Sequence, residues 1–572
     1  MPHMIPKPTG PRPGSMMPMA PDAFKAHMED IAAQKAEYGT KPSWRIPPEP
    51  VPDEQIKETY DADVVIIGLG HAGCATLRGV MEANPNLRVY ALEMMSREDH
   101  WCVGHGIGHI NSKLLQSKGV PKVDPVEFTN NWMAQAHGKA NPSLVMQFAR
   151  NSGDAVDWWL EPCSQEIKDS VNINFWPETP NAIHQLNTGF KYYVGSAEWW
   201  TERSPMNNNK GFEAKDLAWA NLRYVEANFP NAHLHYGVHG EQLIKKDGKL
   251  AGLIAKNDKG EYIKYNATRF VLSTGGFAGN YEMTHDLLPI AKNMRADSDS
   301  DLISMALGRD GSGIKMGYWV GGRLESEISS MVFDSSPCPD QYSGLWLDEN
   351  QERFMNECFA GPEINGFLIA RLKRRQIVSV HDNKILENVT YNLPGHGSYD
   401  PSEPVSVNTL LWNLYDAEQA GKEGADRGPG GKFYAADTLE ELADYIGYDG
   451  EQKARFLQSI ERYNALCDKG VDEDFGKDPR VLFPVKEGPF YAHVTAPRMG
   501  SGLVTTGAFV TNNDQVVLDK DYRPIEGLYA TGNTCGMRFG PAYITPVYGV
   551  SIGMCVTLGR ICGQNVAKSF EK

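Results

Sequence analysis

Apolar positions from residue 63 onward follow two patterns, short continuous runs and helical spacing. The run VVIIG (64–68) is apolar and β-branched, which is typical of a strand buried on both faces. The turn GLGHAG follows, then apolar residues at helical spacing in CATLRGVMEA, then a second buried run, LRVYALE (87–93). Strand, turn, helix and strand within about 30 residues predict a βαβ unit.

Later segments extend this layout. Further strand-like runs are HLHYGV (233–238), LAGLIAK (250–256), ATRFVLST (267–274) and LYAT (528–531). Residues 439–467 predict two amphipathic helices around a turn at Asp449-Gly450. We therefore expect an α/β fold in which a second domain interrupts a nucleotide-binding domain. The expected segments are an N-terminal extension (1–60), the nucleotide-binding domain (61–281 and 446–572) and an inserted α+β capping or substrate domain (282–445).

The extension is rich in proline and methionine before it becomes charged near residue 54. Proline interrupts every apolar run in its first part, so no secretory signal is recognisable. Two interpretations remain open. The extension either wraps the body or forms a subunit contact, or it is a mobile tail.

Composition narrows the class of protein. The chain has 572 residues, of which 41% are apolar and 22% charged, as expected of a globular protein with two or more domains. A net charge of −16 disfavours nucleic acid and anionic membranes as partners. Nine cysteines without a CxxC pair indicate free thiols in a reducing compartment and no zinc or iron–sulfur site. No uncharged apolar run reaches the ~20 residues of a membrane span, so we expect a cytoplasmic protein.

The turn after the first strand has the spacing of a dinucleotide site. In GLGHAG, Gly68 permits the tight turn, Gly70 lets the backbone approach a pyrophosphate, and Gly73 allows close packing of helix on strand. His71 and Ala72 lie between them, at the helix N-terminus that would face the phosphates. Glu93, at the end of the second strand, can accept hydrogen bonds from ribose hydroxyls and disfavours a 2′-phosphate.

Two more strand ends favour FAD over NAD. The run VLSTGGF ends a buried strand with Gly275 and Gly276, and GLYATGN ends another with Gly532 and Asn533. A simple NAD domain does not need these additional glycine sites. The longer flavin dinucleotide does, because backbone must also approach its ribityl chain and ring system.

These motifs together resemble the fumarate reductase/succinate dehydrogenase flavoprotein superfamily. The segments that carry the resemblance, in family order, are GLGHAG with Glu93, VLSTGGFAGN (271–280), LWLDENQERFMNE (345–357), YNALCDKGVDEDFGK (463–477), GPFYA (488–492) and GLYATGN (527–533). The resemblance implies a Rossmann-like FAD-binding domain (GR2-type), a mobile capping domain, and hydride exchange between flavin N5 and a carbon–carbon double bond. It also aligns His105, Gly106 and Gly108 with the family's flavin-contacting stretch. We assume that FAD is bound noncovalently.

The C-terminal motif is similar to that of 3-ketosteroid dehydrogenases. Where fumarate reductases carry a dicarboxylate-binding histidine and arginine, this chain has residues 504–508 without histidine and residues 545–551 without arginine. Ala360 also replaces a frequent arginine, so fumarate is not the expected substrate. Gly540 to Tyr543, followed by Ser551 and Ile552, instead matches the ketosteroid pattern. By this resemblance Tyr543 would hydrogen-bond the substrate ketone.

The residues themselves agree with a ketone-activated alkene. Hydride addition to an enone places negative charge on the carbonyl oxygen, which a phenol such as that of Tyr543 can stabilise. Tyr548, Arg538 and His105 or His109 are candidates for the remaining acid–base and anchoring roles. Arg538 could equally bind FAD or solvent, and Arg353 with Glu357 could form a structural ion pair or a proton path.

We expect an FAD-dependent oxidoreductase acting on CH–CH groups, in a small apolar ketone or enone. Two alternatives remain. One is an unsaturated-carboxylate (acrylate-type) reductase in which Arg538 binds the carboxylate, and the other is a non-catalytic flavoprotein subunit of an electron-transfer assembly. Electrons would come from or go to a separate partner. The direction of the reaction and the oligomeric state are left open, with a homo-oligomer one possibility.

Overall fold

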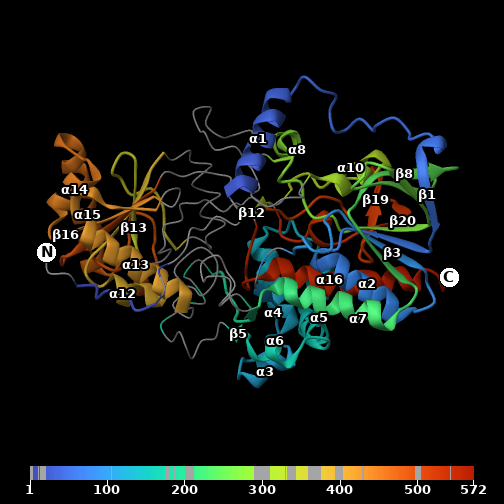
Figure 1. Ribbon diagram of the computed structural model, residues 1–572. Coiled ribbons are helices and arrows are strands. Elements are labelled where there is room, and N and C mark those ends of the chain that lie inside the picture. The colour runs from blue at the N-terminus through green and yellow to red at the C-terminus, as the bar shows by residue number, and fades with distance from the viewer. Residues whose placement is uncertain are drawn as a thin grey trace.

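The computed structural model describes residues 4–571 apart from 11, 13–20, 103, 105, 174–180, 182, 184, 186, 188, 200–211, 289–309, 329, 332–342, 359–374, 393–403, 428–430, 496–503 and 541–542. The described residues form two lobes, shown at the right and left of Figure 1.

A six-stranded sheet lies at the centre of the larger lobe, in the order β19-β20-β11-β2-β3-β7. Its strands are β19 (Val516–Leu518), β20 (Pro524–Ala530), β11 (Arg269–Leu272), β2 (Val64–Ile67), β3 (Val89–Glu93) and β7 (Ala232–Tyr236). All pair in parallel except β19 with β20. Every residue of β2 is buried, as the continuous apolar run predicts.

Alternate residues of β2 pack into different layers, because successive side chains of a strand point to opposite faces. Val64 and Ile66 contact the apolar residues of the helical layer, which contains α2 (His71–Ala83), α5 (Pro142–Leu160), α7 (Ala214–Asn228) and α16 (Val550–Lys568). Val65 and Ile67 belong to the opposite layer. Glycines let α2 and α16 pack closely, since a Cβ on Gly563 would lie 2.4 Å from Thr76 O. Figure 1 shows these two helices side by side below the sheet.

The opposite layer is a second sheet, in the order β1-β10-β9-β8, with one helix beside it. Its members are β1 (Ile56–Asp61), β10 (Tyr262–Asn266), β9 (Lys249–Asn257), β8 (Val238–Lys246) and α10 (Ser312–Trp319). This helix–sheet–sheet arrangement confirms the predicted α/β Rossmann-like class.

The smaller lobe is built on a five-stranded antiparallel sheet, β13-β14-β17-β16-β15. Its elements are β13 (Leu345–Asp348), β14 (Ile377–His381), β15 (Ala425–Asp426), β16 (Lys432–Ala436), β17 (Phe490–Thr495), α12 (Ile385–Asn388), α13 (Pro404–Ala420), α14 (Leu439–Ile446) and α15 (Gly450–Lys469). The expected boundary at residue 446 does not coincide with an edge of this lobe. Phe456 and Ile460 of α15 pack into its core, and β17 is paired between β14 and β16.

The N-terminal extension contacts both lobes. Ile5 packs against α13, where its N–H and that of Met4 donate to Glu418. Further along, α1 (Pro21–Glu37) lies beside α8 (Tyr281–Leu287), and Trp44 donates to Glu282 and Asp286. In Figure 1 the N-terminus lies at the left lobe and β1 at the right. Of the two interpretations of residues 1–60, the described part supports wrapping.

Short elements complete the described chain: η1 (Asp53–Gln55), β4 (Gly106–Gly108), α3 (Lys113–Ser117), α4 (Pro125–Gln135), α6 (Gln165–Asp169), β5 (Asn172–Ile173), β6 (Ser196–Glu198), β12 (Ser330–Met331), η4 (Val389–Tyr391), η5 (Gly421–Glu423), η7 (Pro479–Val481), β18 (Val504–Thr505) and η8 (Gly532–Thr534). Within the described ranges, no helix is both long and apolar enough to cross a membrane.

Candidate functional site

The glycine-rich turn after β2 is tightly packed on one side and open on the other. Gly68 has φ +95°, which favours glycine, and a Cβ on Gly73 would lie only 1.9 Å from Gly68 O. By contrast, a Cβ on Gly70 would meet no atom of the described residues within 4 Å. Gly68 and Gly73 are therefore required by the fold, whereas the space at Gly70 is available to a ligand.

The first turn of α2 follows directly. His71 and Ala72 are its first two residues, both buried, and the turn has no acidic residue and no side-chain cap. The N–H groups of this turn and the positive end of the helix dipole are thus suited to an anion.

Glu93 closes the other side of the turn. Its carboxylate lies at the end of β3 and accepts the N–H groups of Leu69 and Met95, each at 3.0 Å. The acid predicted to bind ribose is therefore held against the glycine turn by backbone donors.

Two hydroxyl groups at neighbouring strand ends are buried without a partner. Thr274 follows β11 and Thr531 follows β20, and Oγ1 of each is enclosed and forms no hydrogen bond with any residue that the structure describes. Gly275 and Gly532 come next in the chain, and a Cβ on Gly275 would meet no atom within 4 Å. Buried hydroxyl groups without partners are unfavourable unless a ligand satisfies them. The open space and unused donors along this sheet edge fit an elongated dinucleotide.

The N-terminus of α16 adjoins the same edge. A Cβ on Gly532 would lie 2.7 Å from the Cβ of Ala72, and Ser551 Oγ lies 3.5 Å from Asn533 Oδ1. Ser551 and Ile552 occupy the first turn of α16. The turns of α2, η8 and α16 therefore meet.

Glycines join β4 to the loop before α16. Gly108 N–H donates to Gly549 O at 2.9 Å, and a Cβ on Gly108 would lie 2.1 Å from Tyr548 O. The half-buried ring of Tyr548 lies over Gly106, where a Cβ would be 2.7 Å from Cε1. Gly276, in the loop after β11, contacts Thr505, whose hydroxyl accepts the N–H of Phe277 at 2.9 Å.

Arg538 is fully buried and mostly engaged by protein acceptors. Nε donates to Cys535 O at 3.0 Å, and Nη2 donates to Thr506 O and Asn533 Oδ1, each at 2.8 Å. Nη1 is buried and forms no hydrogen bond within the described part of the chain. Arg538 thus holds the 535–538 turn against residue 506. Its Nη1 remains able to donate to a bound ligand or water.

Tyr543 is buried in an aromatic cluster. Its ring centroid is 4.8 Å from that of Phe539, which in turn lies 5.6 Å from that of Trp132. The adjoining chain is anchored, since Tyr193 N–H donates to Pro546 O at 2.7 Å. The predicted candidate His105 lies outside the described residues.

His109, the alternative to His105, is held by hydrogen bonds to neighbouring residues of its own segment. Its Nδ1 lies 2.8 Å from Ile107 O, so it donates there, and its Nε2 lies 2.8 Å from Ser112 Oγ. Ser112 Oγ accepts the N–H of Leu115, so its proton is free to go to Nε2. Burial lowers the pKa of His109 to about 4, and the neutral ring is retained at neutral pH.

Sequence reasoning overlooked a thiol cluster at the glycine turn. The carbonyl oxygen of Leu69 lies 2.9 Å from His100 Nε2, 3.0 Å from Cys74 Sγ and 3.7 Å from Cys102 Sγ. Contact with the Cys74 thiol and with His100 lowers the pKa of Cys102, against the effect of burial. Cys102 is isolated in the sequence, so only the fold reveals this cluster.

Arg353 and Glu357 form a buried ionic network in the smaller lobe. Arg353 donates to Glu357 at 2.9 and 2.8 Å and to both oxygens of Asp472 at 2.8 Å. Lys477 Nζ lies 3.6 Å from Glu357. Burial would raise the pKa of Asp472, but its bonds from Arg353 and from backbone N–H groups lower it to about 2. Of the two readings, this geometry supports a structural ion pair.

Comparison with known proteins supports the assignment of the glycine-rich cradle to a dinucleotide. The FAD binding domain family matches residues 63–546. Vinyl phenol reductase of Lactiplantibacillus plantarum is 28% identical over 56% of this chain and 65% of its own length. Urocanate reductase of Eggerthella lenta is 23% identical over 92% and 77%, and 3-oxosteroid 1-dehydrogenase of Mycolicibacterium smegmatis is 27% identical over 57% of each. The chain thus spans less than two thirds of the first and third of these relatives.

The fold has solved counterparts. The structure of 3-ketosteroid-Δ4-(5α)-dehydrogenase from Rhodococcus jostii RHA1 superposes with a TM-score of 0.66 at 18% identity, covering 91% of this chain and all of that one. The expected resemblance to fumarate reductase-like and ketosteroid dehydrogenase-like flavoproteins is confirmed, as is FAD as the cofactor. The cradle has open space and donors that fit FAD, and the chain belongs to the FAD binding domain family.

Proposed function

We propose that this protein exchanges hydride with the C=C or C–C bond next to a ketone, with Tyr543 stabilising the enolate. The supporting observation is the position of Tyr543, which is buried among Phe539, Trp132 and other apolar residues beside the α16 end of the cradle. FAD, when bound, supplies hydride exchange at flavin N5.

The chain's own residues would bind and polarise the substrate. A phenol in a water-poor cluster is a stronger stabiliser of developing oxyanion charge than one in solvent, because the local dielectric is low. Phe539, Trp132 and Val547 belong to the same apolar cluster as Tyr543, and such surroundings suit a cyclic ketone or enone. The substrate's electrons would be exchanged with a separate partner.

The relatives support the broader class, FAD-dependent oxidoreductases that act on CH–CH groups, and they are compatible with a second candidate function. Their printed names, a vinyl phenol reductase, a urocanate reductase and a 3-oxosteroid 1-dehydrogenase, all describe unsaturated or ketonic substrates. The unpartnered Nη1 of Arg538 is the observation that favours an unsaturated carboxylate instead. In that case Arg538, rather than Tyr543, would anchor the substrate.

Paired substitutions separate these candidates. The FAD-loaded protein is first titrated anaerobically with enones, saturated ketones and unsaturated acids, following flavin absorbance. Tyr543→Phe should then lower kcat with a ketonic substrate by about 100-fold, the usual effect of removing one oxyanion donor. Arg538→Lys should affect that substrate less and should raise KM strongly for a carboxylate.

Tyr529→Phe is the matched control, because Tyr529 is also a buried tyrosine but lies on β20, away from Phe539 and Trp132. It should leave turnover unchanged. Unaltered turnover in Tyr543→Phe, with a substrate that reduces or oxidises the flavin, would contradict the role of Tyr543.

A further inference from the structure

Glu325 is a buried carboxylic acid to which the proposed chemistry assigns no role. Residues 322–325 pair with 509 and 519, and Glu325 N–H donates to Ala508 O at 2.8 Å. This pairing directs the side chain inward. Its Oε2 accepts the N–H of Met537 at 2.8 Å, whereas Oε1 is enclosed and has no hydrogen-bond partner among the described residues.

Two glycines make room for the carboxylate. A Cβ on Gly507 would lie 1.9 Å from Glu325 Oε1, and one on Gly536 would lie 2.7 Å from it. Any larger residue at either position would displace the acid. The place of Glu325 is therefore built by segments that are remote from it in sequence.

These segments also form the cofactor edge of the sheet. Thr505 contacts the strand-end Gly276, and Thr534 Oγ1 donates to Gly275 O at 3.0 Å. Arg538, one residue after the donor to Glu325, has the unpartnered Nη1. An unused carboxyl oxygen and an unused guanidinium nitrogen thus flank the same turn. A water molecule that contacted both atoms would satisfy their hydrogen-bonding capacity.

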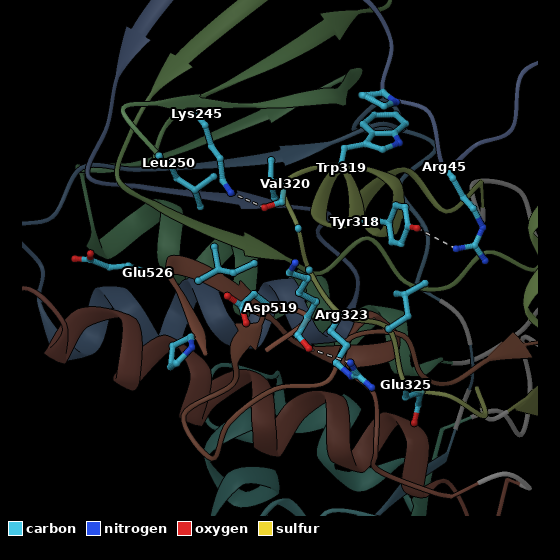
Figure 2. A pocket seen from close by; sticks show the side chains of 18 of the residues that line it. Arg45, Lys245, Leu250, Tyr318, Trp319, Val320, Arg323, Glu325, Asp519 and Glu526 are labelled. Atoms are coloured by element: carbon cyan, nitrogen blue, oxygen red, sulfur yellow. Dashed lines mark hydrogen bonds between the residues drawn. The ribbon is translucent and has the colours of Figure 1, made fainter. Parts of the chain in front are cut away.

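On its other side Glu325 reaches a large cavity of about 1180 Å³. Arg323, Leu324, Glu325, Ser326 and Ile328 line it, together with residues of α10, β9 and β20. Figure 2 shows Glu325 at one edge of this cavity, beside Arg323. The residue as a whole is half-buried and lines the cavity, and its carboxyl lies against the 507 and 536 segments.

From this geometry we infer that Glu325 is a proton relay between the cavity and the substrate end of the cofactor edge. The inference rests on the proposed function, because CH–CH exchange requires one proton for each hydride. During reduction one substrate carbon receives the hydride and the other a proton. That proton leaves the Glu325 carboxyl through the water beside Arg538, and the carboxylate recovers it from water in the cavity. During dehydrogenation each step runs in reverse.

The acid is poised for this exchange near neutral pH. Burial raises the pKa of Glu325 to about 8, although the Met537 N–H and the charge of Arg538 act in the opposite direction. Among the described residues, two charged or titratable groups lie near the carboxyl, and both belong to the 535–538 turn. They are Arg538 and Cys535, and burial raises the pKa of Cys535. A relay with a pKa near the working pH both donates and accepts efficiently.

Glu325→Gln tests the relay, since glutamine keeps the acceptor for Met537 N–H and removes the proton. Glu327→Gln is the matched control, because Glu327 lies two residues away and pairs with Lys139 at the surface. In the FAD-loaded protein, Glu325→Gln should lower kcat by about 100-fold or more and remove the ionisation near pH 8 from its pH profile. KM and the profile of Glu327→Gln should match the wild type.

Infrared difference spectroscopy gives a readout that needs no substrate. The wild type and Glu327→Gln should show a protonated carboxyl C=O band that disappears between pH 7 and 9, and Glu325→Gln should lack it. If the band is absent from the wild type or persists in Glu325→Gln, the inference is overturned. A wild-type pH profile in Glu325→Gln overturns it too. Failure of every ketonic, enone and carboxylate substrate would instead contradict the proposed function, and the infrared band would still decide the state of Glu325.

Discussion

The carboxylate of Glu93 accepts the backbone N–H of Leu69 at 3.0 Å, which joins the end of β3 to the glycine turn that follows β2. The acid and the turn are 24 residues apart in the chain. This bond fixes the acid that the sequence predicts to bind ribose, relative to the open side of the turn, before any ligand binds. The geometry of the cradle is thus set by the apoprotein.

Gly70→Ala and Gly73→Ala should have opposite consequences. A Cβ on Gly70 meets no protein atom within 4 Å and the residue has φ −66°, so Gly70→Ala should fold with an unchanged melting temperature. It should weaken FAD binding by about 10-fold or more, because the methyl group occupies the ligand's space. Isothermal titration of the apoprotein with FAD measures this.

Gly73→Ala provides the contrast. Its methyl group would lie 1.9 Å from Gly68 O, so this variant should be strongly destabilised or insoluble. Equal FAD affinity in Gly70→Ala and the wild type would show that FAD does not approach this turn.

Acid should destabilise the fold through His109. Its pKa is about 4 in the folded protein and about 6.5 when unfolded, so the unfolded state binds more protons between these values. The contribution of the neutral ring is complete above pH 6.5 and is lost as pH falls toward 4, by about 3 kcal/mol in total. Urea unfolding at a series of pH values should show this slope.

His109→Asn should flatten that slope, because asparagine does not titrate. His137→Asn serves as control, since His137 is an exposed residue just after α4. A slope that survives in His109→Asn would assign the acid sensitivity to other groups.

Arg353 should stabilise the smaller lobe far more than a surface arginine does. Replacing it with methionine leaves Glu357 and Asp472 buried with Lys477 as the remaining cation, which should cost about 3–5 kcal/mol. Guanidinium-induced unfolding, followed by the fluorescence of tryptophans including buried Trp346, reports it.

Arg462→Met is the comparison, because Arg462 pairs with Asp474 at the surface of the same lobe. It should cost far less stability than Arg353→Met, because solvent screens the exposed pair. Similar losses for the two variants would argue against a structural role for the Arg353 network.

Ile5 should anchor the extension to the smaller lobe. It is 5% exposed and packs with Val389, Leu410 and Leu414. Ile5→Ala should lower stability by about 2–5 kcal/mol, the range for a buried isoleucine. It should also speed proteolysis within the first 60 residues, whereas Lys7→Ala, at an exposed site, should change neither. Unchanged proteolysis in Ile5→Ala would show that the extension is held elsewhere.

The sequence by itself determined the parts of this protein whose physics is local. A β-branched run, a glycine turn and a helical pattern occur consecutively at 64–83, so the βαβ unit and its acid Glu93 were predictable from spacing. The strand-end glycines at 275 and 532 were recognisable for the same reason. Family motifs then supplied FAD, because they are specific when found together.

Only the tertiary structure decided what distant segments build jointly. Phe490–Thr495 is the central strand of the five-stranded sheet of the smaller lobe. It pairs with Ile377–His381, more than a hundred residues earlier, which no local pattern shows. Arg353 meets Asp472 across 119 residues, and Cys74 and Cys102 meet at one carbonyl oxygen. Glu325 is an unremarkable residue in the sequence and becomes a buried acid because two glycines some two hundred residues later leave it space. Side-chain environment depends on long-range packing, and packing is what the linear pattern does not contain.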